Sequence, residues 1–136
     1  MRKIFSIYKV QPCAQDGHCQ YRAILNQLNS NGRTNNLTVH ELRRRVHNYI
    51  RTHSERFRPF VSDVSMETYL KGVTESGWGD ELTLSVIATL LKLRITVFIV
   101  RPRMRTLVYE VGAKGRKRVR LLLDQEMQHY SGLVPK

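Results

Sequence analysis

The chain has 136 residues, of which 41% are hydrophobic and 25% are charged. This length and composition are typical of one globular domain, and they exclude a long disordered chain. No segment approaches the roughly 20 apolar residues of a membrane-spanning helix. We therefore expect a single domain over residues 1–136, with no membrane span, that acts as a monomer. The formal net charge of +12 favours acidic partners, without distinguishing nucleic acid, a membrane surface and protein.

The chain has two cysteines, Cys13 and Cys19. Two are too few for a disulfide framework, and we recognise no secretory signal, so we expect an intracellular setting, cytoplasmic or nuclear. His40, His47 and His53 are spaced by six or seven residues, which does not place two ligands on adjacent helical turns. A solvated helix face explains them better, and we expect no metal and no cofactor.

The first half of the chain predicts mainly helices. Residues 4–10 are rich in β-forming side chains and predict a short strand that Pro12 ends. Hydrophobic periodicity then predicts four helices, over residues 19–28, 38–53, 65–74 and 80–91. Thr38 begins a Thr-x-x-Glu capping box, and Asp80 can cap the last of these helices. The arginines at 43–45 are expected on a solvated helix face.

The second half predicts strands, over residues 95–100, 106–111, 119–123 and 129–134. Helices followed by a largely antiparallel sheet give an α+β order. Eight of the 23 Lys and Arg residues fall between Arg101 and Arg120, in an expected β-hairpin. This region could contact phosphates, but it lacks interleaved aromatic side chains beyond Tyr109. We favour the interpretation that its charge keeps a sheet edge soluble.

Cys19 is the candidate nucleophile. It is expected to open a helix directly after a polar turn that contains Gly17, where the positive end of the helix dipole favours a thiolate. Backbone N–H groups of that turn could stabilise an oxyanion. A cysteine nucleophile also needs a base that is near in space. His129 is the better candidate, because the side chain of His18 is expected to point away from the sulfur.

Three sequence blocks resemble one known family, the OTU (ovarian tumour) cysteine proteases. Asp16-Gly17-His18-Cys19, followed by Tyr-Arg-Ala-Ile, resembles the nucleophile motif of the family. The block Trp-Gly-Asp-Glu-Leu at 78–82 is similar to its central motif, and His129-Tyr130 is similar to its C-terminal histidine–aromatic pair. The resemblance extends over about residues 10–134, with the three blocks in the order of the family.

The resemblance implies a papain-like α+β fold, with N-terminal helices packed on a mainly antiparallel sheet from the C-terminal half. It implies hydrolysis of isopeptide or peptide bonds after the C-terminal glycines of ubiquitin or a ubiquitin-like protein. Cys19 would form a thioester and His129 would act as general base, with Asp16 as a further candidate catalytic residue. Gly17 and His18 would shape the oxyanion turn and the groove.

One position departs from the family pattern. Many members carry Asp or Asn two residues after the histidine, and here that residue is Ser131. Ser131 could orient the imidazole, Asp16 or another carboxylate could replace it, or Cys19 and His129 could act as a dyad.

The other residues of the motifs have structural interpretations. Trp78 and Tyr130 are expected to support the site, Asp16 can also cap the helix that begins at Cys19, and Cys13 is expected to be inert. The alternative function is a basic binding module for nucleic acid or an acidic partner, with weak or no protease activity.

Overall fold

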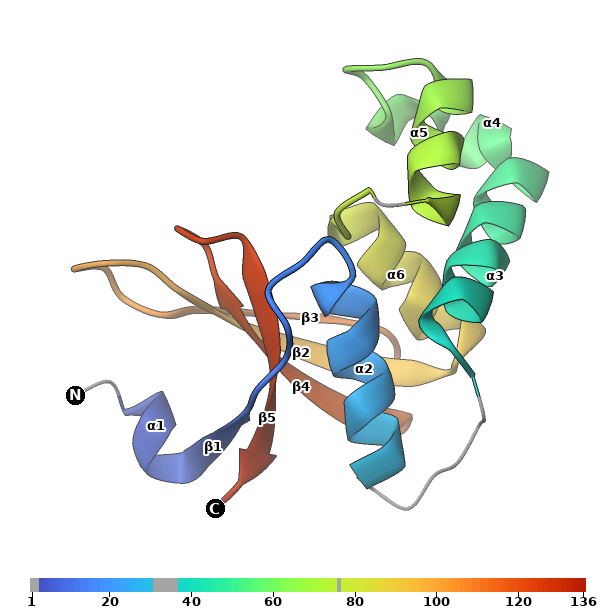
Figure 1. Ribbon diagram of the computed structural model, residues 1–136. Helices are drawn as coiled ribbons and strands as arrows, with labels where there is room; N and C mark the ends of the chain where they lie inside the picture. Colours follow the sequence, from blue (N-terminus) through green and yellow to red (C-terminus); the bar gives the residue numbers. More distant parts are fainter. Residues whose placement is uncertain (1–2, 31–36, 76) are drawn as a thin grey trace.

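The computed structural model describes residues 3–30, 37–75 and 77–136 (Figure 1). Most of the helices precede most of the strands, as an α+β order requires. The helical elements are α1 (Ile4–Ile7), α2 (Cys19–Ser30), α3 (Val39–Thr52), α4 (Ser54–Phe57), the 3-10 turn η1 (Arg58–Phe60), α5 (Met66–Thr74) and α6 (Glu81–Leu90). The strands are β1 (Tyr8–Gln11), β2 (Leu93–Val100), β3 (Leu107–Val111), β4 (Lys117–Asp124) and β5 (His129–Pro135).

The five strands form one sheet in the order β1-β5-β4-β2-β3. Three of the four neighbouring pairs are antiparallel, and β2 with β4 is parallel, with Ile95 opposite Val119. The mainly antiparallel C-terminal sheet is thereby confirmed. The expectation of one basic hairpin over residues 101–120 is wrong, because β3 and β4 pair with opposite edges of β2. Gly112, at φ +97°, lies in the turn where the chain leaves β3.

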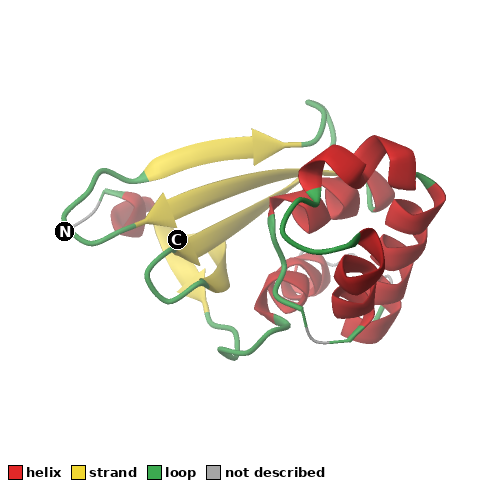
Figure 2. Cartoon of the chain, turned by 90° about the horizontal axis from the view of Figure 1, so that it is seen from above, coloured by secondary structure: helices red, strands yellow, loops and turns green. Residues whose placement is uncertain are grey.

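The helices from α2 to α6 gather against one face and one end of the sheet (Figure 2). Helix α2 packs on β4 and β5, α6 packs on β2 and β3, and α3 packs against α2, α5 and α6. The main core lies between these layers, and its fully buried members include Ile24, Leu42, Leu84, Ile95 and Leu121. A smaller cluster on the opposite face joins α1 to the sheet.

Local capping explains where the longer helices begin. Thr38 accepts the N–H of Glu41 and the Glu41 carboxylate accepts the N–H of Thr38, so the expected capping box is present. Asp80 and Thr83 form an equivalent reciprocal pair at the start of α6. Ser65 caps α5 by accepting the N–H of Thr68. These starts are determined by residues three apart in the sequence.

The N-terminal segment differs from the sequence prediction. Residues 4–7 form one helical turn and β1 begins only at Tyr8, although residues 4–10 predict a strand. The backbone N–H and the hydroxyl of Ser6 both donate to the Lys3 carbonyl, and Ile4 packs against Leu122 and Leu133. Tertiary packing thus overrides the β propensity of a segment too short to show a period.

Within the described residues, no helix has both the length and the apolar character to cross a bilayer.

Gln27 fixes α2 to the centre of the sheet. Its side-chain amide donates to the Leu133 carbonyl at 2.9 Å and to the Arg120 carbonyl, and its Oε1 accepts the Arg120 N–H at 2.9 Å. At Gly132, any Cβ would lie 2.9 Å from the Gln27 amide nitrogen, so the strand can approach the helix closely only with glycine there. These hydrogen bonds fix the position of α2 along β4 and β5.

Candidate active site

The N-terminus of α2 lies beside the start of β5. Cys19, the first residue of the helix, is 1% exposed, and its Sγ accepts the backbone N–H of Tyr130 at 3.4 Å. β1 ends at Gln11, which pairs with Gly132, so β5 continues three residues, back to His129, beyond the last paired position on that edge. Beyond the end of β1, the Cys19 thiol takes the place of a strand partner for the backbone N–H of Tyr130. His129 is therefore the immediate chain neighbour of the group that binds the sulfur.

The electrostatic setting of the thiol differs from the expectation of a resting thiolate. Burial raises the pKa of the Cys19 thiol above its ordinary value, and the N–H groups of Tyr130 and Gln20 lower it by less. The helix terminus therefore does not by itself produce a thiolate. Proton removal requires a base, which makes the position of His129 important.

His129 lies on β5 directly opposite Asp124 of β4. Side chains directly opposite in an antiparallel pair share a face, as do side chains two residues apart on one strand. His129, Asp124 and Ser131 therefore lie on the same face of the sheet, and Ser131 is buried. The Nδ1 atom of His129 is buried and has no hydrogen-bond partner among the described residues.

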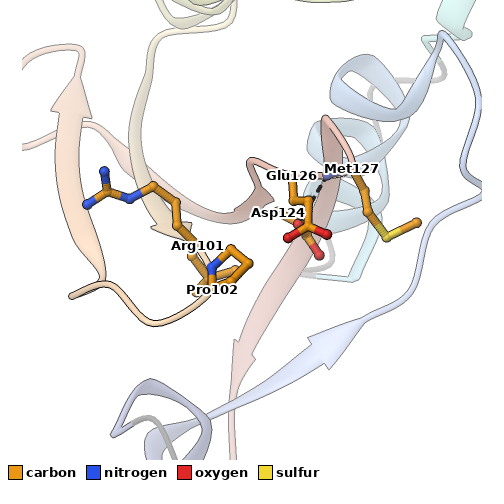
Figure 3. Close-up of a pocket in the computed structure, with 6 residues that line it drawn as sticks. Arg101, Pro102, Asp124, Glu126 and Met127 are labelled. Atoms are coloured by element: carbon orange, nitrogen blue, oxygen red, sulfur yellow. Dashed lines mark hydrogen bonds between the residues drawn. The ribbon is translucent and has the colours of Figure 1, made fainter.

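The Asp124 carboxylate lies at the hairpin between β4 and β5, where Oδ1 accepts the backbone N–H of Met127 at 3.3 Å (Figure 3). It borders a cavity of about 230 Å³ between this hairpin and the segment that follows β2. Arg101 and Pro102 line the opposite side (Figure 3). A carboxylate that sequence reasoning did not single out thus lies across the ladder from His129. Because strand register depends on long-range pairing, motif spacing could not have indicated it.

Asp16 organises the turn before Cys19. Its Oδ1 accepts the backbone N–H of His18 at 2.9 Å, and its Oδ2 accepts a hydrogen bond from Arg22 at 2.8 Å. The Arg22 guanidinium lowers the pKa of the Asp16 carboxyl. One oxygen closes an Asx turn before α2 and the other binds Arg22, so in these two bonds Asp16 shapes the turn and does not accept a backbone N–H of α2, as the expected cap would.

Arg43 is a site residue that the sequence analysis misplaced. It was expected on a solvated face with Arg44 and Arg45, yet it is completely buried, while its two neighbours are exposed. A signal was available, because Arg43 lies three residues before Val46 and seven before Ile50, both on the apolar side of α3. Its guanidinium donates to the Gly17 carbonyl at 2.7 Å.

His18 also contacts Arg43. Its Nδ1 accepts the Nε–H of Arg43 at 3.0 Å, so Nδ1 is unprotonated and the neutral ring carries its proton on Nε2. Burial and the Arg43 charge lower the pKa of the His18 imidazole. His18 is thus held as a neutral donor next to the nucleophile turn.

The block at 78–82 supports α2 through Gln20. The Gln20 amide donates to the Asp80 carbonyl at 3.0 Å, and its Oε1 accepts the Thr83 hydroxyl at 2.7 Å. A side chain at Gly79 would overlap with Gln20, which explains the glycine in this block. Trp78 is 53% exposed and borders a surface pocket beside α5, so it is not a core residue.

The remaining residues occupy supporting positions. Tyr130 is buried in the main core next to the nucleophile. Cys13 is a free, half-buried thiol whose Sγ–H donates to the Cys19 carbonyl at 3.7 Å. Burial raises the pKa of the Cys13 thiol, as it does that of Cys19.

Comparison with known proteins defines the class. The family model of the OTU-like cysteine proteases matches residues 14–130, and the chain belongs to this family. Over 99 residues it is 36% identical to the deubiquitinase OTUD6B of Xenopus tropicalis, covering 65% of this chain and 33% of that protein. The chain therefore spans about a third of the length of this relative.

Solved structures share the fold. An OTU deubiquitinase from Wolbachia pipientis wMel bound to ubiquitin has a TM-score of 0.76 at 14% identity, covering 94% of this chain and 96% of that one. An ovarian tumour domain in complex with ubiquitin has a TM-score of 0.78 at 18% identity, covering 95% of this chain and 70% of that one. These similarities confirm the OTU fold expected from the three sequence blocks.

Proposed function

We propose that this protein is a thiol-dependent deubiquitinase that cleaves the bond after the C-terminal glycines of ubiquitin or a ubiquitin-like protein. The observation that carries the proposal is the Tyr130 N–H bound to Cys19 Sγ, which fixes the nucleophile beside His129. The names of the relative and of the ubiquitin-bound structures support this class of substrate. Two free thiols support a reducing, intracellular setting.

The reaction begins with proton transfer. His129 accepts the thiol proton of Cys19 as Sγ attacks the glycyl carbonyl carbon, and the carbonyl oxygen becomes an oxyanion. When this intermediate collapses, His129 returns the proton to the leaving amine and a thioester to Cys19 remains. Water, deprotonated by His129, then hydrolyses the thioester and regenerates the thiol.

Two backbone groups are suited to bind the oxyanion. The N–H of His18 is already used by the Asp16 carboxylate. The N–H of Gly17 donates to no acceptor within the described residues, and that of Cys19 makes only a long bond of 3.3 Å to the Asp16 carbonyl. The Gly17 and Cys19 N–H groups are therefore the proposed donors. Loss of one such donor typically lowers kcat by about 100- to 1000-fold.

We propose that the group that orients the His129 imidazole lies on the same face of the sheet as His129. Ser131 follows it by two residues, and Asp124 lies directly across the ladder. Asp16 is already bound to Arg22 and the His18 N–H, so its contribution is to shape the turn. If Ser131 orients the imidazole, Ser131→Ala lowers kcat and Asp124→Asn does not. The reverse result assigns the role to Asp124, and two unchanged rates indicate a dyad.

Turnover of ubiquitin carrying a C-terminal fluorogenic amide tests the function. The wild-type chain is expected to release the fluorophore, while Cys19→Ala and His129→Ala are expected to release none above background. Cys13→Ala is the matched cysteine control and is expected to keep wild-type activity. Circular dichroism establishes that each variant is folded. An inactive wild type, or an active Cys19→Ala, would disprove the proposal.

A further inference from the structure

The buried guanidinium of Arg43 connects three parts of the molecule. Besides its bonds to the Gly17 carbonyl and His18 Nδ1, Nη1 donates to the Val73 carbonyl at 3.0 Å, and the guanidinium carbon lies 4.2 Å from the centre of the Tyr21 ring. No carboxylate forms an ion pair with it among the described residues. A buried charge is costly unless its donors are satisfied, and here a neutral acceptor binds each of the three guanidinium nitrogens.

These contacts hold the Gly17–His18 peptide group at both ends. The carbonyl oxygen of this peptide is bound by Arg43 at 2.7 Å, and its N–H is bound by the Asp16 carboxylate at 2.9 Å. The peptide plane therefore cannot rotate without breaking two charge-assisted hydrogen bonds. Glycine otherwise permits such a rotation, because it lacks a Cβ.

We propose that Arg43 is a positioning residue that holds the Gly17–His18 peptide and the His18 tautomer, so that the N–H groups of Gly17 and Cys19 converge on the oxyanion. The inference rests on the proposed function, because it assigns a catalytic consequence to the turn. Arg43 acts through the backbone and does not touch the reacting atoms.

Arg43 also links the turn to α5. The Val73 carbonyl belongs to the last turn of that helix, where carbonyls lack partners within the helix. The same side chain that binds this carbonyl binds the nucleophile turn, so displacement of the end of α5 alters the support of the turn. Lysine cannot replace this contact pattern, because one ammonium group lacks the planar fork of donors.

The test compares Arg43→Met with wild type in ubiquitin-amide turnover. Methionine keeps much of the volume and removes all donors, and replacing a buried charge by an apolar side chain is often compatible with folding. We expect kcat to fall by about 100-fold, the loss typical of one oxyanion donor, with KM changed by less than about 3-fold. Arg44→Met, at the exposed neighbouring position, is the control and is expected to leave both constants unchanged.

A second measurement separates positioning from a general loss of structure. Long-range ¹H–¹⁵N NMR of His18 is expected to show an unprotonated Nδ1 in the wild type and in Arg44→Met, and a mixture of tautomers in Arg43→Met. The charged or titratable groups near this ring are Arg43, Asp16, Arg22 and His40. Of these groups, only Arg43 is changed in Arg43→Met, so a rise in the pKa of His18 in this variant reports the loss of the Arg43 charge.

The outcomes distinguish the two proposals. An active wild type with unchanged kcat in folded Arg43→Met, or an unchanged His18 tautomer in that variant, would overturn the role of Arg43 and leave the protease function intact. An inactive wild type would overturn the proposed function itself. The His18 spectra would still test whether Arg43 holds the His18 ring and the Gly17–His18 peptide. If Arg43→Met does not fold, Arg43→Lys is measured instead, and full activity there would refute the need for a planar fork of donors.

Discussion

Cys19 depends on its surroundings for reactivity, because burial keeps its thiol protonated at rest. The N–H of Tyr130 faces the sulfur and can stabilise the thiolate once the proton has left. The proposed catalysis therefore depends on His129 as base and on N–H donors of the turn that bind the oxyanion. Asp16 and Arg43 hold this turn from opposite sides.

Asp16 gives a pH-dependent test of the turn. Its pKa is lower in the folded chain than the value of about 3.9 expected in the unfolded chain, so its ion pair with Arg22 stabilises the fold above that value. The stabilisation is lost as the pH falls through the lowered pKa. We expect wild type to melt at a higher temperature than Asp16→Asn at about pH 6, with the difference shrinking as the pH is lowered below about 3.9. A difference that persists at the lowest pH would contradict this assignment, and exposed Asp63→Asn serves as the control.

The nucleophile and its motif were predictable from sequence, because Asp16 to Cys19 are consecutive and the turn and helix start are local. The pairing of His129 with Cys19 spans 110 residues. It was proposed because His129 begins the last expected strand, which can pack on the first helix, and the family resemblance then agreed with it. Arg43 was missed because arginine in a basic run normally lies on a solvated face. Its burial depends on acceptors contributed by Gly17, His18 and Val73, which only the folded chain brings together.

Among the secondary-structure elements, α2 and β5 determine the geometry of the site. The helix carries the proposed nucleophile and the strand carries the proposed base. Gln27 joins the helix to the sheet at the other end of the helix. The starts of α3, α5 and α6 were predictable because capping is local. The helical turn of α1 and the parallel pairing of β2 with β4 were not, since both depend on distant packing partners.

Gln27 gives a stability test at this scale. Gln27→Leu has nearly the same size but leaves the Arg120 N–H and two buried carbonyls without their partner. We expect the free energy of unfolding to fall by about 3 kcal/mol, since one unsatisfied buried group typically costs about 1–3 kcal/mol. Urea denaturation measures this as a lower midpoint with an unchanged m-value. Asn29→Ala, at an exposed position on the same helix, is the control, and an equal loss there would refute the specific role of Gln27.

For the whole molecule, the charge of +12 raises the alternative of a nucleic-acid-binding module. The expected basic hairpin does not exist as one unit, and part of its charge is neutralised. Glu110 pairs with Arg94 at 2.8 Å and with Arg118 at 3.7 Å on the sheet surface. Arg120 instead lies over the Tyr8 ring. Part of the basic region is therefore engaged by partners within the chain.

Fluorescence anisotropy with labelled single-stranded DNA tests this alternative. We expect a dissociation constant weaker than about 10 µM at about 150 mM salt, with any binding at low salt lost steeply as salt is added. Glu110→Gln removes the shared carboxylate and is expected to strengthen low-salt binding. Submicromolar binding by wild type at 150 mM salt would support the nucleic-acid alternative.

The central claim is that Cys19 attacks the C-terminal carbonyl of a bound ubiquitin. Incubation with ubiquitin carrying a C-terminal electrophile, followed by intact-mass and peptide mass spectrometry, tests it most directly. We expect one covalent adduct, located on Cys19, in wild type and in Cys13→Ala, and none in Cys19→Ala. Absence of an adduct with wild type, or an adduct that persists in Cys19→Ala, would contradict it.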